Sequence, residues 1–163
     1  MTNYTFPITR TTTPRPRPED PANPGFAKYF TDHIFVMDYD EGQGWHDGRI
    51  VPHQPFLIEP ASSVLHYAQT AFEGMKAYAA PDGSIQLFRP DMNAARMERT
   101  CERLCIPSLP EGAFIAAIEQ LIKVDADWMP TGANTSLYIR PFIFANQSTI
   151  SVGPANKYCF MIF

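Results

Sequence analysis

The chain has 163 residues, of which 45% are hydrophobic and 18% are charged, and its formal net charge is −4. This length suits one domain with a buried core. The negative charge argues against nucleic-acid binding, which needs a surplus of Lys and Arg to neutralise phosphates. No apolar run approaches the roughly 20 residues of a membrane-spanning helix, and the first residues lack the charged-then-apolar order of a secretory signal.

The cysteines and histidines do not have the spacing of a metal site. His33, His46 and His53 are not at metal-ligand spacings. The three cysteines, Cys101, Cys105 and Cys159, are an odd number without disulfide or zinc spacing. Cys101 and Cys105 would share one face of a helix and act there as small apolar side chains. We therefore expect structural cysteines, no metal, and a reducing cytoplasm.

Residues 1–25 are predicted to form an extended or disordered arm. Their sequence T-T-T-P-R-P-R-P-E-D-P-A-N-P-G offers few apolar side chains, and its prolines favour extended backbone. Such an arm can be disordered or can lie over a neighbouring surface, and the sequence leaves both open. We place the ordered domain at residues 26–163, with order beginning near Phe26.

The first half of this domain has the pattern of antiparallel strands. A β-prone run at residues 33–37 and a return strand from residue 49 flank a Gly-rich turn. Residues 56–59 are predicted to form a further short strand, ended by Pro60. Residues 61–72 are ambiguous, with a short helix near residues 68–72 as one alternative. Residues 75–78 and 85–88 flank A-A-P-D-G-S, which is a strong hairpin signal.

Two helices and further strands follow. The first helix, residues 90–105, begins at Pro90 and carries Arg96, Arg99 and Arg103 on one side. The second, residues 110–127, has apolar residues at core spacing. S-L-Y-I-R-P-F-I-F then alternates like one half-buried strand, and K-Y-C-F-M-I-F begins another. This order predicts an α+β fold, a mainly antiparallel sheet with two helices on one side.

The last residues form an apolar strand pattern with no polar cap, although domain ends are usually exposed. A terminal strand docked in the sheet is one interpretation. We expect instead that the chain is truncated within a longer protein.

Arg96 is the best candidate anion ligand, because a planar guanidinium on a rigid helix suits phosphate or carboxylate. The alternative is a solvated helix face, since Glu98 and Glu102 lie among the arginines. Tyr138 and Arg140 alternate with apolar residues and so point to one face of their strand. They could bind a substrate carboxylate, or they could be an ordinary surface pair.

Four neighbouring residues could also line a pocket, although a core histidine beside aromatics is the commoner arrangement: His66, Tyr67, Phe72 and Glu73. The sequence contains no P-loop, dinucleotide-binding glycine pattern, nucleophile elbow or zinc-protease motif. Residue chemistry alone therefore predicts, at most, a site for a small anionic molecule.

Several motifs, in order, resemble the branched-chain amino acid aminotransferases, which are fold-type IV pyridoxal-phosphate enzymes. The resemblance runs from about Phe26 to the last residue and implies the small N-terminal domain of a two-domain subunit, with the cofactor at the domain junction. The motifs are S-S-V-L-H-Y-A-Q-T-A-F-E-G-M-K-A-Y, L-F-R-P-D-M-N-A-A-R-M-E-R, L-C-I-P, D-W-M-P and S-L-Y-I-R-P-F.

The resemblance also implies roles for individual residues. Arg96 matches the arginine that holds the phosphate of pyridoxal 5′-phosphate, and Arg140 matches an arginine associated with the second carboxylate of glutamate. The other substrate-binding positions are Phe26, Phe72 and Tyr138, in the pocket for an aliphatic side chain, and Tyr67, Ile150 and Val152, which reach into the partner subunit's pocket.

The family's Schiff-base lysine lies in the larger domain, past Phe163, and Lys76 in F-E-G-M-K is not its match. The resemblance therefore implies no catalytic residue in this chain, which alone should be inactive. The whole protein is expected to be a cytoplasmic homodimer that transfers amino groups between leucine, isoleucine or valine and 2-oxoglutarate. The alternatives are a D-amino acid aminotransferase or aminodeoxychorismate lyase, against which S-L-Y-I-R-P and the long arm argue, and a non-catalytic dimerisation module.

Overall fold

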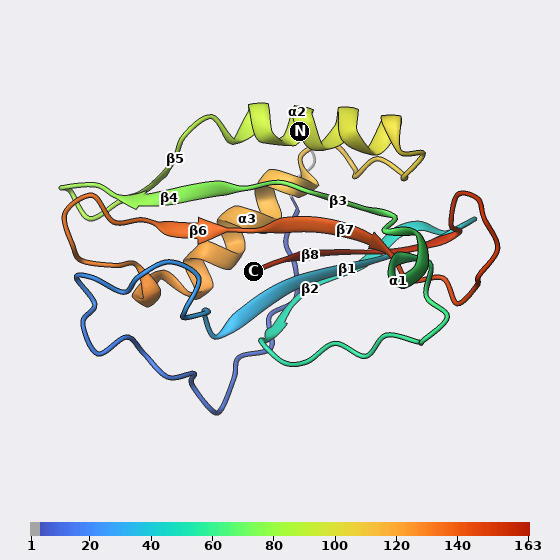
Figure 1. Ribbon diagram of the computed structural model, residues 1–163. Coiled ribbons are helices and arrows are strands. Elements are labelled where there is room, and N and C mark those ends of the chain that lie inside the picture. Colours follow the sequence, from blue (N-terminus) through green and yellow to red (C-terminus); the bar gives the residue numbers. More distant parts are fainter. Residues whose placement is uncertain (1–3) are drawn as a thin grey trace.

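The computed structural model describes residues 4–163, which form two antiparallel β-sheets with helices packed against them (Figure 1). The larger sheet has five strands in the order β2-β1-β8-β7-β3, and the smaller has three in the order β5-β4-β6. The strands are β1 (His33–Asp40), β2 (Gly44–Pro52), β3 (Thr70–Phe72), β4 (Met75–Ala79), β5 (Ile85–Leu87), β6 (Leu137–Ile139), β7 (Pro141–Ala145) and β8 (Lys157–Ile162). The helices are α1 (Ser63–Tyr67), α2 (Pro90–Arg103), α3 (Ala113–Val124) and the short 3-10 helix η1 (Ala126–Trp128).

The predicted α+β class is confirmed, and so is the placement of two helices on one side. Side chains of α2 and α3, such as Met97 and Phe114, share one apolar cluster with Phe35 and Phe160 of the large sheet. The opposite face carries a second cluster, where α1 packs through Val64. Because both faces of the large sheet are covered, the apolar residues of β8 run without a break.

The two hairpins, β1–β2 and β4–β5, are confirmed. The strand predicted at residues 56–59 is wrong, because this segment lies between Pro55 and Pro60 and runs over the surface, with Leu57 94% exposed. The alternative of a helix at residues 68–72 is also wrong. Ala68 has the left-handed conformation that ends α1 (φ 51°), and the chain continues directly into β3, which pairs with β7.

The segment predicted as one strand, S-L-Y-I-R-P-F-I-F, is divided at Arg140. Before this residue, β6 pairs with β4 in the small sheet; after it, β7 pairs with β8 and β3 in the large sheet. Arg140 itself exchanges backbone hydrogen bonds with Phe163, at 2.7 and 3.2 Å. The chain therefore crosses from one sheet to the other at Arg140, and the neighbouring side chains lie at the seam between the sheets.

Cys101 and Cys105 do not share a helix face, contrary to our expectation. Cys101 is buried in α2, whereas Cys105 follows the helix end in a left-handed conformation (φ 55°) and is exposed. Burial raises the pKa of the Cys101 thiol to about 11. Cys159 is buried in β8, and all three thiols are free. Cys101 and Cys159 thus act as core side chains.

The predicted arm, residues 1–25, is described from residue 4 onward, and residues 1–3 lie outside the described part. The described arm lies against its own domain. Phe6 is buried, with its ring edge-on to Phe35 at 4.7 Å, so the core includes a residue ahead of Phe26, where we expected order to begin. Gly48 in β2 leaves the necessary space, since a Cβ there would lie 2.7 Å from the Phe6 ring.

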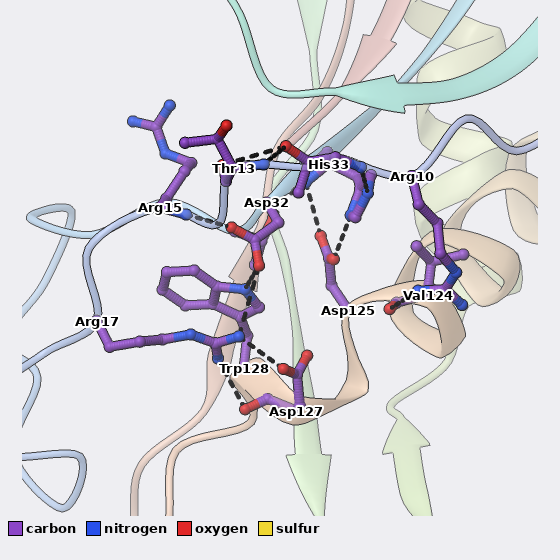
Figure 2. A network of polar contacts seen from close by, with 12 residues as sticks. Arg10, Thr13, Arg15, Arg17, Asp32, His33, Val124, Asp125, Asp127 and Trp128 are labelled. Atoms are coloured by element: carbon purple, nitrogen blue, oxygen red, sulfur yellow. Dashed lines mark hydrogen bonds and ion pairs between the residues drawn. The ribbon is translucent and has the colours of Figure 1, made fainter.

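Figure 2 shows how polar contacts hold the middle of the arm. Asp32 is buried and accepts hydrogen bonds from the backbone N–H of Arg15 at 2.6 Å and from Nε1 of Trp128 at 2.8 Å. The guanidinium of Arg17 stacks over the Trp128 ring, 3.8 Å from its centroid, and donates to the Asp127 carboxylate at 2.6 Å. These contacts fasten the arm to η1.

A buried histidine adds a second attachment (Figure 2). The backbone N–H of Thr11 donates to Nε2 of His33 at 2.9 Å, so the ring proton lies on Nδ1. Nδ1 in turn donates to Asp125 at 2.6 Å, at the end of α3. The arm, the start of β1 and the end of α3 are therefore joined through buried polar groups, each with a partner.

Candidate functional site

The F-E-G corner, residues 72–74, connects β3 of the large sheet to β4 of the small sheet. Glu73 is buried, with 3% of its surface exposed, and its backbone N–H donates to the carbonyl of Pro141 at 2.9 Å. Its carboxylate faces α2. There Arg96 donates from Nε to Oε1 at 2.5 Å and from Nη2 to Oε2 at 2.7 Å. This is a two-pronged ion pair with its carboxylate inside the protein.

Asn93 completes the surroundings of Glu73. It lies three residues before Arg96, on the same side of α2, and donates from Nδ2 to Oε2 at 2.8 Å. Burial alone would raise the pKa of Glu73, but the hydrogen bonds from Arg96 and Asn93 and the charge of Arg96 outweigh it, and the pKa is lowered. Glu73 is therefore an anion at neutral pH.

Arg96 keeps part of its guanidinium free for a ligand. Its hydrogen bond with Glu73 raises its pKa, so it is always charged. Its side chain is nevertheless 60% exposed. Glu73 accepts one hydrogen bond from Nε and one from Nη2. The other three N–H groups of the guanidinium have no hydrogen-bond acceptor within residues 4–163. The alternative of a solvated helix face is thus too simple a description of Arg96, because a buried partner orients its side chain.

A second group of side chains lies on the other side of the corner. The guanidinium of Arg140 stacks on the ring of Phe72, 4.5 Å from its centroid, and donates from Nη2 to the hydroxyl of Tyr138 at 2.7 Å. Phe26, which directly follows the arm, packs edge-on against Tyr138 at 5.5 Å. Four residues for which the resemblance implies substrate binding are therefore in contact, although they come from the segment before β1, β3, β6 and the seam.

Gly74 joins the two groups, since a Cβ there would lie 2.5 Å from the hydroxyl of Tyr138. Only a glycine lets Tyr138 lie over the backbone at this point. At the corner, Phe72 contacts Arg140, Glu73 contacts Arg96 and Asn93, and Gly74 lies against Tyr138.

The chemistry of the second group suits a ligand that is partly apolar and partly anionic. Phe26 and Phe72 are exposed aromatic surface, at 72% and 61%. Arg140 has no carboxylate partner within the described part of the chain. The hydroxyl of Tyr138 accepts from Arg140, so its own proton is available to a ligand. The carboxylate of a ligand can therefore contact the Arg140 guanidinium and the Tyr138 hydroxyl, beside the apolar surface of Phe26 and Phe72.

Tyr67, Ile150 and Val152 form a separate exposed patch at α1. The hydroxyl of Tyr67 donates to the backbone carbonyl of Ile150, which fixes the loop 146–156 against this helix. Ile150 and Val152 are 68% and 87% exposed. None of the three contacts Phe72, Tyr138 or Arg140 among the interactions of residues 4–163. They are therefore distinct from the site at the corner.

Other residues singled out from the sequence lie elsewhere. His66 is not a core histidine: it is exposed and its Nε2 meets the carbonyl of Pro60 at 2.8 Å. Lys76 is an exposed residue of β4, in accordance with the surface role expected for it. In the described part of the chain, no three His, Cys, Asp or Glu side chains gather as a metal-ion site. The helices found among these residues are too short or too polar to cross a membrane.

Sequence reasoning missed the site residue Asn93 and the contact between Glu73 and Arg96. Glu73 was considered only as a pocket-lining residue, and Asn93 not at all. The local signal is weak: an acidic residue before a glycine, and an amide three positions before an arginine on the same helix. The two segments meet only because α2 packs against β3.

Comparisons with known proteins identify several relatives, although no protein-family model matches the chain. It is 50% identical over 143 residues to branched-chain-amino-acid transaminase 1 of Bacillus subtilis, which is 88% of this chain and 40% of that protein. It is 44% identical over 162 residues to branched-chain-amino-acid aminotransferase 2 of the same organism, 99% of this chain and 44% of that protein. A probable branched-chain-amino-acid aminotransferase of Streptomyces coelicolor is 49% identical over 142 residues, 86% of this chain and 39% of that protein.

Solved structures with the same fold include the branched-chain amino acid aminotransferases of Escherichia coli and of Thermoproteus uzoniensis, the latter with norvaline. The first has a TM-score of 0.57 and 22% identity, over 81% of this chain and 40% of that one. The second has a TM-score of 0.59 and 22% identity, over 80% of this chain and 40% of that one. At this identity the likeness shows the fold alone. The chain spans about two fifths of the length of the curated relatives it matches.

Proposed function

The chain belongs to the branched-chain aminotransferase family, whose N-terminal part it matches, and on that premise we propose that it serves a pyridoxal-phosphate enzyme that moves amino groups between branched-chain amino acids and 2-oxo acids. The observation that carries the proposal is the meeting of two groups at the F-E-G corner. One is the oriented cation Arg96; the other combines an apolar wall with Arg140. The relatives' names favour this reading over the other fold-type IV enzymes.

The residues present fit the phosphate of pyridoxal 5′-phosphate. A phosphate needs fixed, charged N–H donors, and Arg96 offers three that have no acceptor among the described residues. Arg96 would hold the phosphate through this exposed edge. When bound, the cofactor supplies an electron-withdrawing ring that makes the α-proton of an amino acid acidic. The chain's own contribution is to anchor and orient.

Substrate recognition rests on the second group. Phe26, Phe72 and Tyr138 would surround the aliphatic side chain of leucine, isoleucine or valine and exclude water from it. Glutamate has a carboxylate in the same position, which Arg140 and the Tyr138 hydroxyl can receive. Stacking on Phe72 and hydrogen bonding to Tyr138 lower the cost of leaving Arg140 beside an apolar substrate.

The proposal includes a cytoplasmic homodimer. Exposed apolar side chains gather at Tyr67, Ile150 and Val152, and such patches are typical of contact surfaces between proteins. The partner subunit's pocket would be completed by these residues. The three free thiols suit a reducing compartment.

Arg140→Ala in the full-length protein tests the proposal. We expect the KM for glutamate to rise about 10- to 100-fold, because a charge-assisted contact is lost, while the KM for leucine changes about twofold or less. Steady-state transamination of leucine with 2-oxoglutarate, and of glutamate with the 2-oxo acid of leucine, measures both constants. Equal losses for the two amino acids, or no transamination by the unmodified protein, would contradict the proposal.

A further inference from the structure

We propose that Glu73 is a positioning residue, which sets the direction of the Arg96 guanidinium so that its free edge meets the cofactor phosphate. This inference rests on the proposed function, in which Arg96 is the phosphate ligand. It assigns to a buried carboxylate a role that composition and motif analysis did not give it.

The geometry of the ion pair fixes which edge of Arg96 is free. A guanidinium is planar and offers N–H groups along two edges that can each bind an anion with two hydrogen bonds. Glu73 occupies the edge formed by Nε and Nη2, at 2.5 and 2.7 Å. The edge formed by Nη1 and the second N–H of Nη2 remains. With both oxygens of Glu73 engaged, the plane of the guanidinium cannot rotate without breaking a bond.

Glu73 can orient Arg96 because it is itself immobile. Its side chain is 2% exposed, whereas that of Arg96 is 60% exposed. Asn93 donates to Oε2, and the backbone N–H of Glu73 donates to the carbonyl of Pro141. The direction of a mostly exposed, flexible side chain is thus set from inside the protein.

The same contacts connect Arg96, the proposed phosphate ligand, to Tyr138 and Arg140, the proposed substrate-binding residues. Pro141 directly follows Arg140, and Gly74 directly follows Glu73 and lies against Tyr138. Asn93 also approaches the carbonyl of Gly74 at 3.5 Å. The corner therefore holds Arg96 in a constant position relative to Tyr138 and Arg140, as a cofactor and a substrate that react together require.

Loss of the Glu73 charge has two opposing effects on phosphate binding. Removing a negative charge near Arg96 would strengthen the attraction, whereas freeing the guanidinium would weaken it. Because Arg96 is mostly exposed, water and salt screen the first effect. The loss of a fixed guanidinium orientation is not screened, because a free arginine side chain can adopt many rotamers. We therefore expect weaker binding.

The test compares the dissociation constants of pyridoxal 5′-phosphate and of pyridoxal, which lacks the phosphate, with the cofactor-free full-length protein. The dissociation constant of pyridoxal divided by that of pyridoxal 5′-phosphate gives the phosphate's contribution to affinity, and absorbance titration measures this ratio without turnover. We expect Glu73→Gln to lower this ratio about tenfold. Glu98→Gln is the matched control, since it removes the same charge from an exposed position two residues after Arg96 and should leave the ratio unchanged.

Glu73→Asp is the second variant, in case Glu73→Gln does not fold. It keeps the charge but withdraws the carboxylate by one methylene, so the two-pronged contact is lost and the ratio should again fall. A purely structural role would weaken both ligands equally and leave the ratio unchanged, which would overturn the inference. Arg96→Gln separates the two proposals. If it leaves the ratio unchanged, the phosphate assignment itself fails; if it lowers the ratio while both Glu73 variants do not, only this inference fails.

Discussion

Among single residues of the corner site, Gly74 has little freedom to change. Its backbone passes so close to Tyr138 that an added Cβ would lie 2.5 Å from the hydroxyl. That hydroxyl also accepts the hydrogen bonds of Arg140. A side chain at position 74 would therefore move Tyr138 and, with it, the cation beside Phe72.

Gly74→Ala is accordingly expected to destabilise the protein by about 1–3 kcal/mol, the usual cost of forcing extra volume into a packed site, and to raise the KM for leucine. Thermal unfolding and steady-state kinetics of the full-length protein measure the two effects. Gly153→Ala is the matched control for stability, because a Cβ there meets nothing within 4 Å. Equal behaviour of the two variants would show that Tyr138 is not held by this contact.

At the scale of elements, the arm depends on buried polar groups as well as on apolar packing. Asp32 contacts two other segments: the arm, through the backbone of Arg15 and the guanidinium of Arg17 at 3.5 Å, and η1, through the ring of Trp128. Burial would raise the pKa of Asp32, but these donors and the nearby positive charges outweigh it, and the pKa is lowered below its ordinary 3.8.

The sign of the pH dependence follows from this. A carboxylate with a lowered pKa in the folded state contributes stability above its ordinary pKa, and the contribution is lost as the pH falls through the lower, folded value. We expect Asp32→Asn to lower the free energy of unfolding by about 1–3 kcal/mol at pH 7, because donors are left facing an amide. The deficit should shrink as the pH falls below 3.8.

Denaturant unfolding from pH 7 to pH 3 measures this difference. Asp127→Asn is the control, since its carboxylate is 70% exposed and its pair with Arg17 should contribute at most about 1 kcal/mol. A deficit for Asp32→Asn that stays constant down to pH 3 would rule out an ionised Asp32 as its cause.

At the scale of the whole molecule, the two surfaces of interest have different roles. The corner site collects residues from the segment before β1, β3, α2, β6 and the seam between the sheets. The patch of Tyr67, Ile150 and Val152 lies apart from it and is held by the contact of Tyr67 with the backbone of Ile150. Its exposed apolar side chains are the proposed contact with a second subunit.

Val152→Asp is expected to shift the full-length protein from dimer toward monomer, because a charge would be buried against apolar surface in the interface. Light scattering over a dilution series measures the dissociation constant, which should rise at least about tenfold. Phe88→Asp is the control, an equally drastic change at an exposed apolar side chain outside the patch. An unaltered dimer in the Val152 variant would remove this patch from the proposed interface.

Elements whose signals lie within a few neighbouring residues could be predicted from the amino-acid sequence. Residues close together in the sequence form the turns of the β1–β2 and β4–β5 hairpins. The apolar spacing that predicts α2 and α3 is likewise local. The motifs around Phe72, Arg96 and Tyr138 likewise pointed to the family and to the residues that meet at the corner.

The contacts between distant segments of the chain could not be predicted in this way. No local signal marks Arg140 as the crossing between two sheets or Phe6 as a core residue. Nor does any local signal pair Glu73 with Arg96, 23 positions apart. Strand pairing and buried ion pairs depend on which surfaces come together in space. The packing of the whole chain determines these contacts, and the sequence neighbours of a residue do not.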